Sequence, residues 1–251
     1  MSADLTPGQW AWAAISILFA AVLRGFTGFG FAVVAVPTAS LMLPPPLVVA
    51  ATLLMQTAIG LRDCIAERKR ADWRSIRWLV TGALVGTPLG LLGLAVLPIA
   101  WIRMALGVLV LIATGVTWRP ITHRGPPERR WGWLAGICSG LGNGLAAMSG
   151  PPAIVYFLAA ETDREVVRSS LLAFFPLASA LALVPAAWGG MVGVPSVLIA
   201  AFGLPLMLAG GWLGTWLFRH YGKTAYRPIA VIALGLTACA TLVRGAAGVL
   251  Q

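Results

Sequence analysis

The chain has 251 residues, of which 59% are hydrophobic and only 10% are charged, and its formal net charge at pH 7 is +10. A soluble domain of this size cannot cover its surface with so few charges, so the composition indicates an integral membrane protein. The apolar runs are too long and uninterrupted for alternating barrel strands, so we predict a polytopic all-α protein. The basic residues lie in short loops, which is typical of cytoplasmic loops rather than of a nucleic-acid interface.

The first apolar run covers residues 10–43 and contains a glycine-rich break at residues 24–30, which read RGFTGFG. Backbone groups freed by such a break cannot face lipid, so the break must be buried in protein or line a cavity. A triple proline at 44–46 ends the run. Together with the spans that follow, this run forms a predicted first repeat over residues 1–118. Those spans are expected at residues 47–66, 76–97 and 99–118.

A basic, proline-containing linker at residues 119–130 precedes a predicted second repeat over residues 131–251. Its first apolar run, 131–160, is expected to break at residues 139–144, which read SGLGNG. Both halves place glycines at four-residue spacing in their third element and a Pro-Ile-Ala triplet at the start of their fourth. The sequence therefore predicts an internal duplication, with a broken segment in matching positions of the two halves. The spans of the second repeat are expected at residues 166–188, 195–218 and 228–248.

Three strongly basic loops, at residues 67–77, 119–130 and 219–227, decide the predicted topology. If every element crossed the membrane, the third loop would face the opposite side from the first two, against the positive-inside bias. If each broken run is instead a re-entrant hairpin, all three loops face the cytoplasm. Each repeat then has one hairpin and three transmembrane helices, and this odd number of crossings makes the two repeats inverted. The alternative is two kinked full spans with one misplaced basic loop.

Intramembrane charge separates the classes of ligand that the chain could carry. All eight acidic residues lie at or near segment ends, so we expect no carboxylate cation site or proton relay within the membrane. Arg24 lies within the first break, where an arginine facing a cavity could receive an anion; the alternative is an arginine that snorkels to the interface or pairs within the protein. Helix N-termini and free amides at both breaks suit an anion as well.

The candidate substrate-binding residues combine this arginine with small polar side chains and with glycines that let the backbone approach a ligand. Thr27, Ser139 and Asn143 are expected to be neutral hydrogen-bond donors, whereas Gln56 is equally consistent with helix packing. Arg168 is a candidate gate, with a headgroup anchor as the alternative. We expect no catalytic residue, metal site or cofactor. The substrate-binding set is Arg24, Gly25, Thr27, Gly28, Gly30, Gln56, Ser139, Gly140, Asn143 and Gly144.

The two broken runs resemble those of the sulfite exporter TauE/SafE family. The resemblance rests on residues 25–30 followed by Pro37, and on residues 139–144 followed by the prolines at 151–152, in two halves of matching order. It implies a carrier in the cytoplasmic membrane that exports sulfite, sulfoacetate or related sulfur-containing anions. The chain departs from the family pattern at residues 145–148, where it has Leu-Ala-Ala-Met in place of further glycines, and this bears on the ligand more than on the family.

The residues themselves predict an anion-selective secondary carrier, and only the resemblance supplies the sulfur specificity. A carrier or channel for another small anion, such as an inorganic oxyanion or a carboxylate, is the alternative. A membrane enzyme or assembly factor has the least support, because no nucleophile–base pair or metal-ligand set occurs in the membrane segments. The predicted partners are the anion and the lipid bilayer, with no nucleic acid. The sequence leaves open the exact substrate, the direction, the coupling ion and the oligomeric state, a homodimer included.

Overall fold

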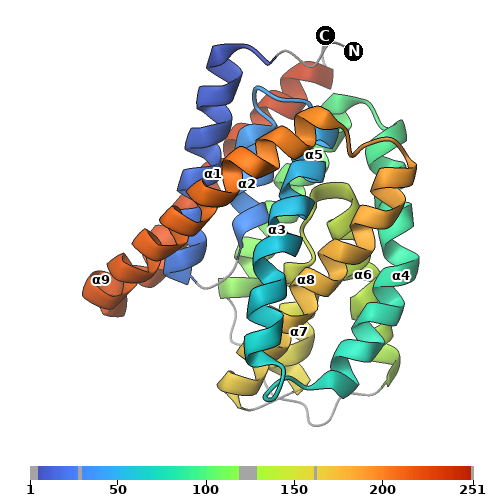
Figure 1. Cartoon of the computed structure of the whole chain (residues 1–251), viewed down its shortest axis with the longest axis vertical. Helices are drawn as coiled ribbons and strands as arrows, with labels where there is room; N and C mark the ends of the chain where they lie inside the picture. Colours follow the sequence, from blue (N-terminus) through green and yellow to red (C-terminus); the bar gives the residue numbers. More distant parts are fainter. Residues whose placement is uncertain (1–4, 28–29, 119–128, 161–162, 250–251) are drawn as a thin grey trace. The chain divides into compact units, whose positions relative to one another are not determined.

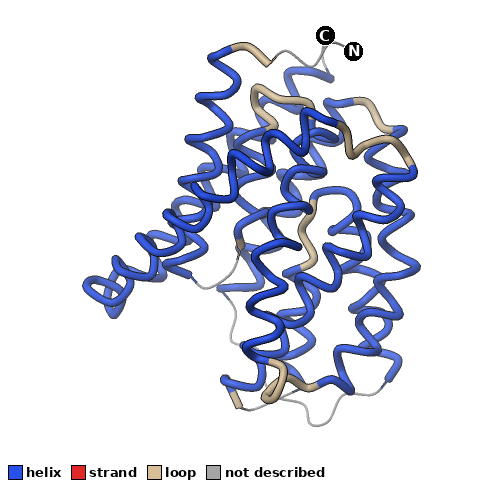
Figure 2. The backbone as a smooth tube through the Cα atoms, viewed as in Figure 1, coloured by secondary structure: helices blue, strands red, loops and turns tan. Residues whose placement is uncertain are grey.

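The computed structural model describes residues 5–27, 30–118, 129–160 and 163–249, and these residues form helices and connecting loops without a strand (Figure 2). Five of the helices in this part of the chain are long and apolar enough to cross a membrane, which confirms the predicted all-α polytopic class. The helices are α1 (Pro7–Thr27), α2 (Phe31–Ala39), α3 (Pro45–Glu67), α4 (Trp73–Val96), α5 (Ile99–Trp118), α6 (Arg129–Ala146), α7 (Gly150–Ala160), α8 (Arg164–Trp188) and α9 (Val194–Val249) (Figure 1).

The chain forms two compact units, and each unit draws on both halves of the sequence. The first unit contains Met1–Thr52, Leu97–Thr114 and Val192–Gln251, and so includes α1, α2, most of α5 and α9. The second unit contains Leu53–Val96 and Gly115–Met191, and so includes most of α3 together with α4, α6, α7 and α8. Each helix break lies within a single unit, so each can be described by its own surroundings.

In the first unit, α1 and α2 form a hairpin. The indole Nε1 of Trp12, in the first half of α1, donates a hydrogen bond of 2.9 Å to the backbone oxygen of Thr38, near the end of α2. The end of α2 therefore returns to the side on which α1 begins. The residue before α2, Gly30, has φ +88°, a left-handed conformation that favours glycine.

The same first arm, α1, packs along α9. The rings of Trp10 and Phe202 meet edge to face with their centroids 5.6 Å apart, and further along both helices Gly25 lies against Gly211. Residue numbers rise together along the contact, so the two helices are parallel (Figure 1). A Cβ atom on Gly25 would lie 2.9 Å from the backbone carbon of Gly211, and one on Gly214 would lie 2.8 Å from the nitrogen of Phe26. The backbones therefore touch directly, as small residues allow in membrane helices.

In the second unit, α4 and α6 repeat this arrangement. Their glycines face each other, and a Cβ atom on any of them would enter the backbone of the opposite helix. Successive contacts again rise together in number, so α4 and α6 are parallel as well. The sequence predicted close packing from the four-residue spacing on α4, and the structure shows that its partner is α6. The facing glycines are Gly82, Gly86 and Gly90 on α4, and Gly136, Gly140 and Gly144 on α6.

The second break lies later than predicted. Helix α6 continues through residues 139–144 to Ala146, and the interruption falls at residues 147–149, so the predicted position is wrong by a few residues. Glycine lowers helix propensity by about 1 kcal/mol, but here the contacts of the glycines with α4 offset that loss. The next helix instead begins where two prolines, at 151–152, occupy its first turn, a position that proline tolerates.

Helix α7 returns alongside α6. The hydroxyl of Tyr156, in the second half of α7, donates a 3.2 Å hydrogen bond to the Oγ atom of Ser75, at the start of α4. A Cβ atom on Gly132, at the start of α6, would lie 3.0 Å from the same hydroxyl oxygen. The end of α7 therefore comes back to the side on which α4 and α6 both begin, so α6 and α7 form a hairpin like that of α1 and α2.

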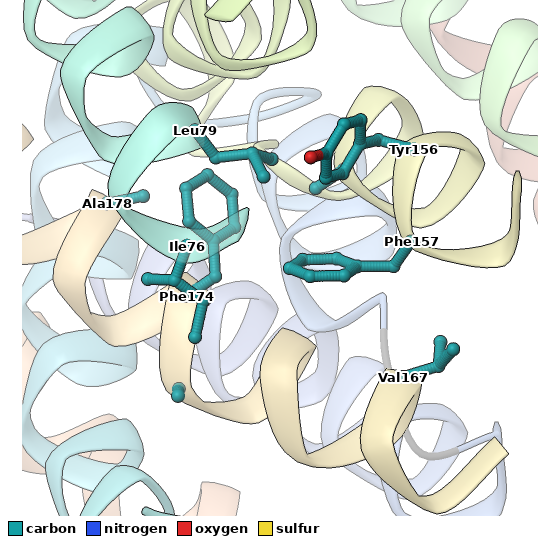
Figure 3. Close-up of a cluster of buried hydrophobic side chains, with 9 residues drawn as sticks. Ile76, Leu79, Tyr156, Phe157, Val167, Phe174 and Ala178 are labelled. Carbon is teal, nitrogen blue, oxygen red and sulfur yellow. The ribbon is translucent and has the colours of Figure 1, made fainter. Parts of the chain in front are cut away.

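A buried apolar cluster fixes α7 against α4 and α8. The side chains of Phe157 and Phe174 are 1% and 0% exposed, and they lie with residues of α4 between α7 and α8 (Figure 3). Since lipid tails are as apolar as these side chains, close packing rather than exclusion of water holds the helices together. The cluster consists of Ile76, Leu79, Ala153, Tyr156, Phe157, Val167, Ala173, Phe174 and Ala178.

Helix α9 differs from the sequence-based expectation. The structure has one helix of 56 residues, where the sequence predicts two spans separated by a basic loop at residues 219–227. That loop contains Gly222, and Pro228 follows it directly, so the local sequence does carry signals of a helix end. The ribbon of α9 reverses its direction partway along, and its last part runs back toward the side on which α9 begins (Figure 1). The part of α9 that qualifies as a span is Val194–Leu217.

Candidate functional site

The first break brings the buried start of α2 next to the end of α1. An α-helix leaves its first amide groups without intrahelical partners, and α2 begins with Phe31, Ala32 and Val33, which are all buried. None of these residues is a proline, so each keeps its N–H donor; Pro37 lies in the last turn. A Cβ atom added at Gly30 would meet nothing within 4 Å, so the left-handed backbone conformation, and not crowding, favours glycine at this position. The break is therefore rich in donors.

Arg24 lies in the last turn of α1, one turn before this break, and is half-buried. A cation is favourable there because the C-terminal end of a helix carries partial negative charge. The close contact with α9 leaves no room for a side chain at Gly25, so helix packing explains why this residue is a glycine, without a ligand. The side chain of Thr27 and the whole of Gly28, both predicted as site residues, lie outside the described residues.

The second break is closed by backbone bonds at the end of α6. The nitrogen of Ala147 donates to the oxygen of Asn143 at 2.7 Å, and the nitrogen of Met148 donates to the oxygen of Gly142 at 3.1 Å. Ala147 has φ +55°, the one left-handed non-glycine residue among those described. From α3, Nε2 of Gln56 donates to the oxygen of Ala147 at 3.2 Å. The structure thus places Gln56 at this break.

Asn143 and Ser139 lie one turn apart on α6 and are both 0% exposed. Nδ2 of Asn143 donates to the backbone oxygen of Ala178 on α8 at 2.8 Å, so one of its two amide hydrogens is used within the protein. Oδ1 of Asn143 and Oγ of Ser139 have no hydrogen-bond partner among the described residues. Asn143 therefore has Oδ1 left over as an acceptor and one further amide hydrogen as a donor, the role that the sequence predicts for it. Gly140 and Gly144, also predicted as site residues, pack against α4 instead.

Two further hydroxyl groups belong to this region, and the sequence analysis missed them. Thr87 of α4 is 1% exposed and Ser179 of α8 is 0% exposed, and neither hydroxyl oxygen has a partner in the described part of the chain. The sequence does contain a signal for them, because both are isolated hydroxyl residues within apolar spans. Such hydroxyls commonly bond to the carbonyl one turn earlier in their own helix, and only the structure shows that these two do not.

The two breaks differ in the hydrogen-bonding groups that they offer. At the second break, the prolines at 151–152 remove two of the first amide donors of α7. At the first break, α2 keeps its donors and Arg24 lies one turn away. The start of α2 therefore offers more amide donors than the start of α7, where only Gly150 and Ala153 of the first four residues keep theirs.

Arg168, the candidate gate, lies outside these breaks in a surface network. Its Nη1 atom is 3.6 Å from Oε1 of Glu67, and Oγ of Ser169 donates to Oε2 of the same carboxylate at 2.7 Å. Nearby, Arg70 and Glu165 form an ion pair of 2.9 Å. These contacts join the loop between α3 and α4 to the start of α8. Exposed pairs of this kind stabilise a fold by about 0–1 kcal/mol, so they can open at low cost.

Comparison with known proteins identifies the family. A curated relative, the probable sulfite/organosulfonate exporter TauE of Cupriavidus necator, is 24% identical over 196 residues, which are 75% of this chain and 76% of the relative. No solved structure matches the chain at a significant level. The family model described as "Sulfite exporter TauE/SafE" matches residues 13–241. Its members are transporters and not enzymes, as predicted, and the apolar helices make this a multi-pass protein of the cell membrane. The protein belongs to the sulfite exporter TauE/SafE family.

Proposed function

We propose that this protein is a secondary transporter that exports small sulfur-containing anions, sulfite or organosulfonates, by alternating access. The observation that carries the proposal is the first break, where an arginine lies one turn from a helix N-terminus whose first residues are buried. The family and the name of the relative support export as the direction and sulfur-containing anions as the substrates. No metal or cofactor enters this mechanism.

The anion is held at the first break in the proposed mechanism. The positive end of the α2 dipole and its free amide groups attract and orient an oxyanion. Arg24 adds a planar, permanently charged donor that can bond two oxygens of a sulfonate or sulfite at once. Gly30 lets the backbone approach the anion without an intervening side chain. Thr27 and Gly28 remain part of the proposed site, with the Thr27 hydroxyl as a further donor.

The re-entrant, inverted arrangement of the repeats is part of the same proposal. The ion pair between Arg70 and Glu165 puts the loop before α4 and the start of α8 on one side of their unit. A re-entrant hairpin of α6 and α7 requires this, whereas a kinked full span would put them on opposite sides. In addition, the first arm of each hairpin packs in parallel, through glycines, on the third element of the other half: α1 on α9 and α6 on α4. A duplication explains this reciprocity.

The topology can be tested by labelling single cysteines in a variant without native cysteine. A membrane-impermeant maleimide applied from outside should label Pro44→Cys and Gly190→Cys, whereas Arg70→Cys and Lys223→Cys should react only after the membrane is permeabilised. This pattern follows from two re-entrant hairpins and six full crossings. Labelling of Lys223→Cys from outside would contradict the inverted arrangement and favour kinked full spans.

The transport function is tested with purified protein in proteoliposomes. We expect uptake of radiolabelled sulfite and sulfoacetate to saturate with concentration and to speed up when the same anion is present on the opposite side. Saturation and trans-stimulation are expected of a carrier, because each transport cycle must return a loaded or empty site. Flux that rises linearly without trans-stimulation would indicate a channel. Competition by nitrate or benzoate, with no effect of sulfoacetate, would assign the site to another anion.

A further inference from the structure

Most buried side-chain oxygens without a hydrogen-bond partner gather in the second unit. Buried polar atoms in proteins are nearly always bonded to protein or to ordered water, so each exception requires an occupant. Among the described residues, the one such atom in the first unit is Oγ of Ser40. The others are Oγ1 of Thr87 on α4, Oγ of Ser139 and Oδ1 of Asn143 on α6, and Oγ of Ser179 on α8.

The hydrogen bond between Asn143 and α8 fixes how two of these oxygens are presented. Nδ2 of Asn143 bonds to the oxygen of Ala178, the residue directly before Ser179, so this face of α6 lies against that turn of α8. The bond also orients the amide, because its nitrogen faces Ala178 and its oxygen is the atom left without a partner. Ser139 lies one turn earlier on the same face of α6.

The backbone around these oxygens also offers acceptors rather than donors. Helix α6 ends at Ala146, and the C-terminal end of a helix carries partial negative charge and carbonyls that lack intrahelical partners. The start of α7 has prolines at 151–152 in place of two amide donors. Nε2 of Gln56 donates a hydrogen bond to the oxygen of Ala147, so that carbonyl already has a partner. A ligand at this break therefore meets hydroxyls, which can bind either a cation or an anion, beside Oδ1 of Asn143 and the negative end of α6, which favour a cation.

We propose that the second break binds a dehydrated sodium ion through Oδ1 of Asn143 and the hydroxyls of Ser139 and Ser179, with the negative end of the α6 dipole close by. Oxygen is the ligand that hard cations prefer, and a site made of neutral oxygens suits a single charge, whereas divalent ions are normally held by carboxylates. The C-terminal ends of interrupted helices are a known means of binding such ions in carriers. The sequence analysis expects no carboxylate cation site within the membrane, and the proposed site contains no carboxylate.

The proposal goes beyond the anion transport described above and does not depend on which anion is carried. An ion bound between α6 and α8 holds the hairpin in one arrangement, so sodium binding should be visible in the stability of the purified protein without any flux measurement. A failure of sulfite transport would leave the sodium result standing, and the reverse also holds.

The test compares thermal unfolding of the detergent-purified protein in sodium, potassium and choline chloride at equal ionic strength. Sodium at about tenfold above its dissociation constant should raise the melting temperature by about 4 °C relative to choline, with a smaller shift in potassium. Ser179→Ala, which removes one hydroxyl and little volume, should abolish the shift and the binding of ²²Na⁺ in equilibrium dialysis. Ser40→Ala, which removes the comparable hydroxyl of the first unit, should preserve both.

Two outcomes would overturn the proposal. If the wild-type protein melts at the same temperature in sodium and choline and binds no ²²Na⁺, the oxygens hold only water. If sodium binds but Ser179→Ala and Asn143→Ala retain the full shift, the ion lies elsewhere. Since the comparison of salts uses the wild-type protein, it remains decisive even where Asn143→Ala fails to fold.

Discussion

Gly25→Ala is expected to lower the melting temperature of the purified protein by about 10 °C, the largest effect on stability that we predict for a single added methyl group. The new Cβ atom would lie 2.9 Å from the backbone carbon of Gly211 and closer still to its carbonyl oxygen. Backbone atoms cannot rotate away, so α1 and α9 must separate and lose contact along their length. Overpacking of this kind costs about 3 kcal/mol.

Gly211→Ala provides a matched control on the facing helix. A Cβ atom at Gly211 meets nothing within 4 Å, so this variant should melt within about 2 °C of the wild type although it adds the same group to the same contact region. Thermal unfolding in detergent measures both variants. If Gly25→Ala melts normally but fails to transport, the glycine serves the approach of a ligand, and the assignment to helix packing is wrong.

The sequence predicted the kind of helix contact but not the partner. Glycines at four-residue spacing on α4 indicate a face that another backbone can approach, because this rule depends only on side-chain size. That the partners come from the other half of the chain, α6 for α4 and α1 for α9, depends on which distant segments fold together within each unit. Local spacing contains no such information.

The second break shows why glycine alone is a weak predictor of a helix interruption. Residues 139–144 contain three glycines and were expected to break the helix, but two of these glycines face α4 and gain contacts that keep α6 intact. The prolines at 151–152 were the better signal, because proline both starts a helix and removes backbone donors. At the first break no proline follows directly, and Gly30 with its positive φ marks the interruption.

The candidate site was predictable in its residue types and not in the direction of its hydrogen bonds. Asn143 and Ser139 stand out in an apolar segment, and the structure buries both completely. Whether an asparagine offers its nitrogen or its oxygen to a ligand depends on what the other end bonds, here the carbonyl of Ala178 on another helix. The sequence therefore predicted polar groups at the second break but not which atom of Asn143 bonds within the protein.

Arg24→Ala is expected to lower the initial rate of sulfite flux about 100-fold at subsaturating concentration. A charge-assisted hydrogen bond to an anion contributes up to about 3 kcal/mol, and each 1.4 kcal/mol is a factor of ten in affinity. Arg24→Lys keeps the charge but loses the planar fork, so its flux should fall only about tenfold.

Arg103→Ala is the control for Arg24→Ala. It shows which effects follow from removing any half-buried arginine and which follow from losing an anion-binding group. Arg103 belongs to the same unit, and its Nε atom donates to the backbone oxygen of Ser40 at 3.1 Å. Its removal should reduce the melting temperature and leave the concentration for half-maximal flux unchanged, whereas Arg24→Ala should raise that concentration. Equal effects of the two variants on flux would show that Arg24 acts through the fold. The anion would then have to be held at the first break by the amide groups of α2 alone.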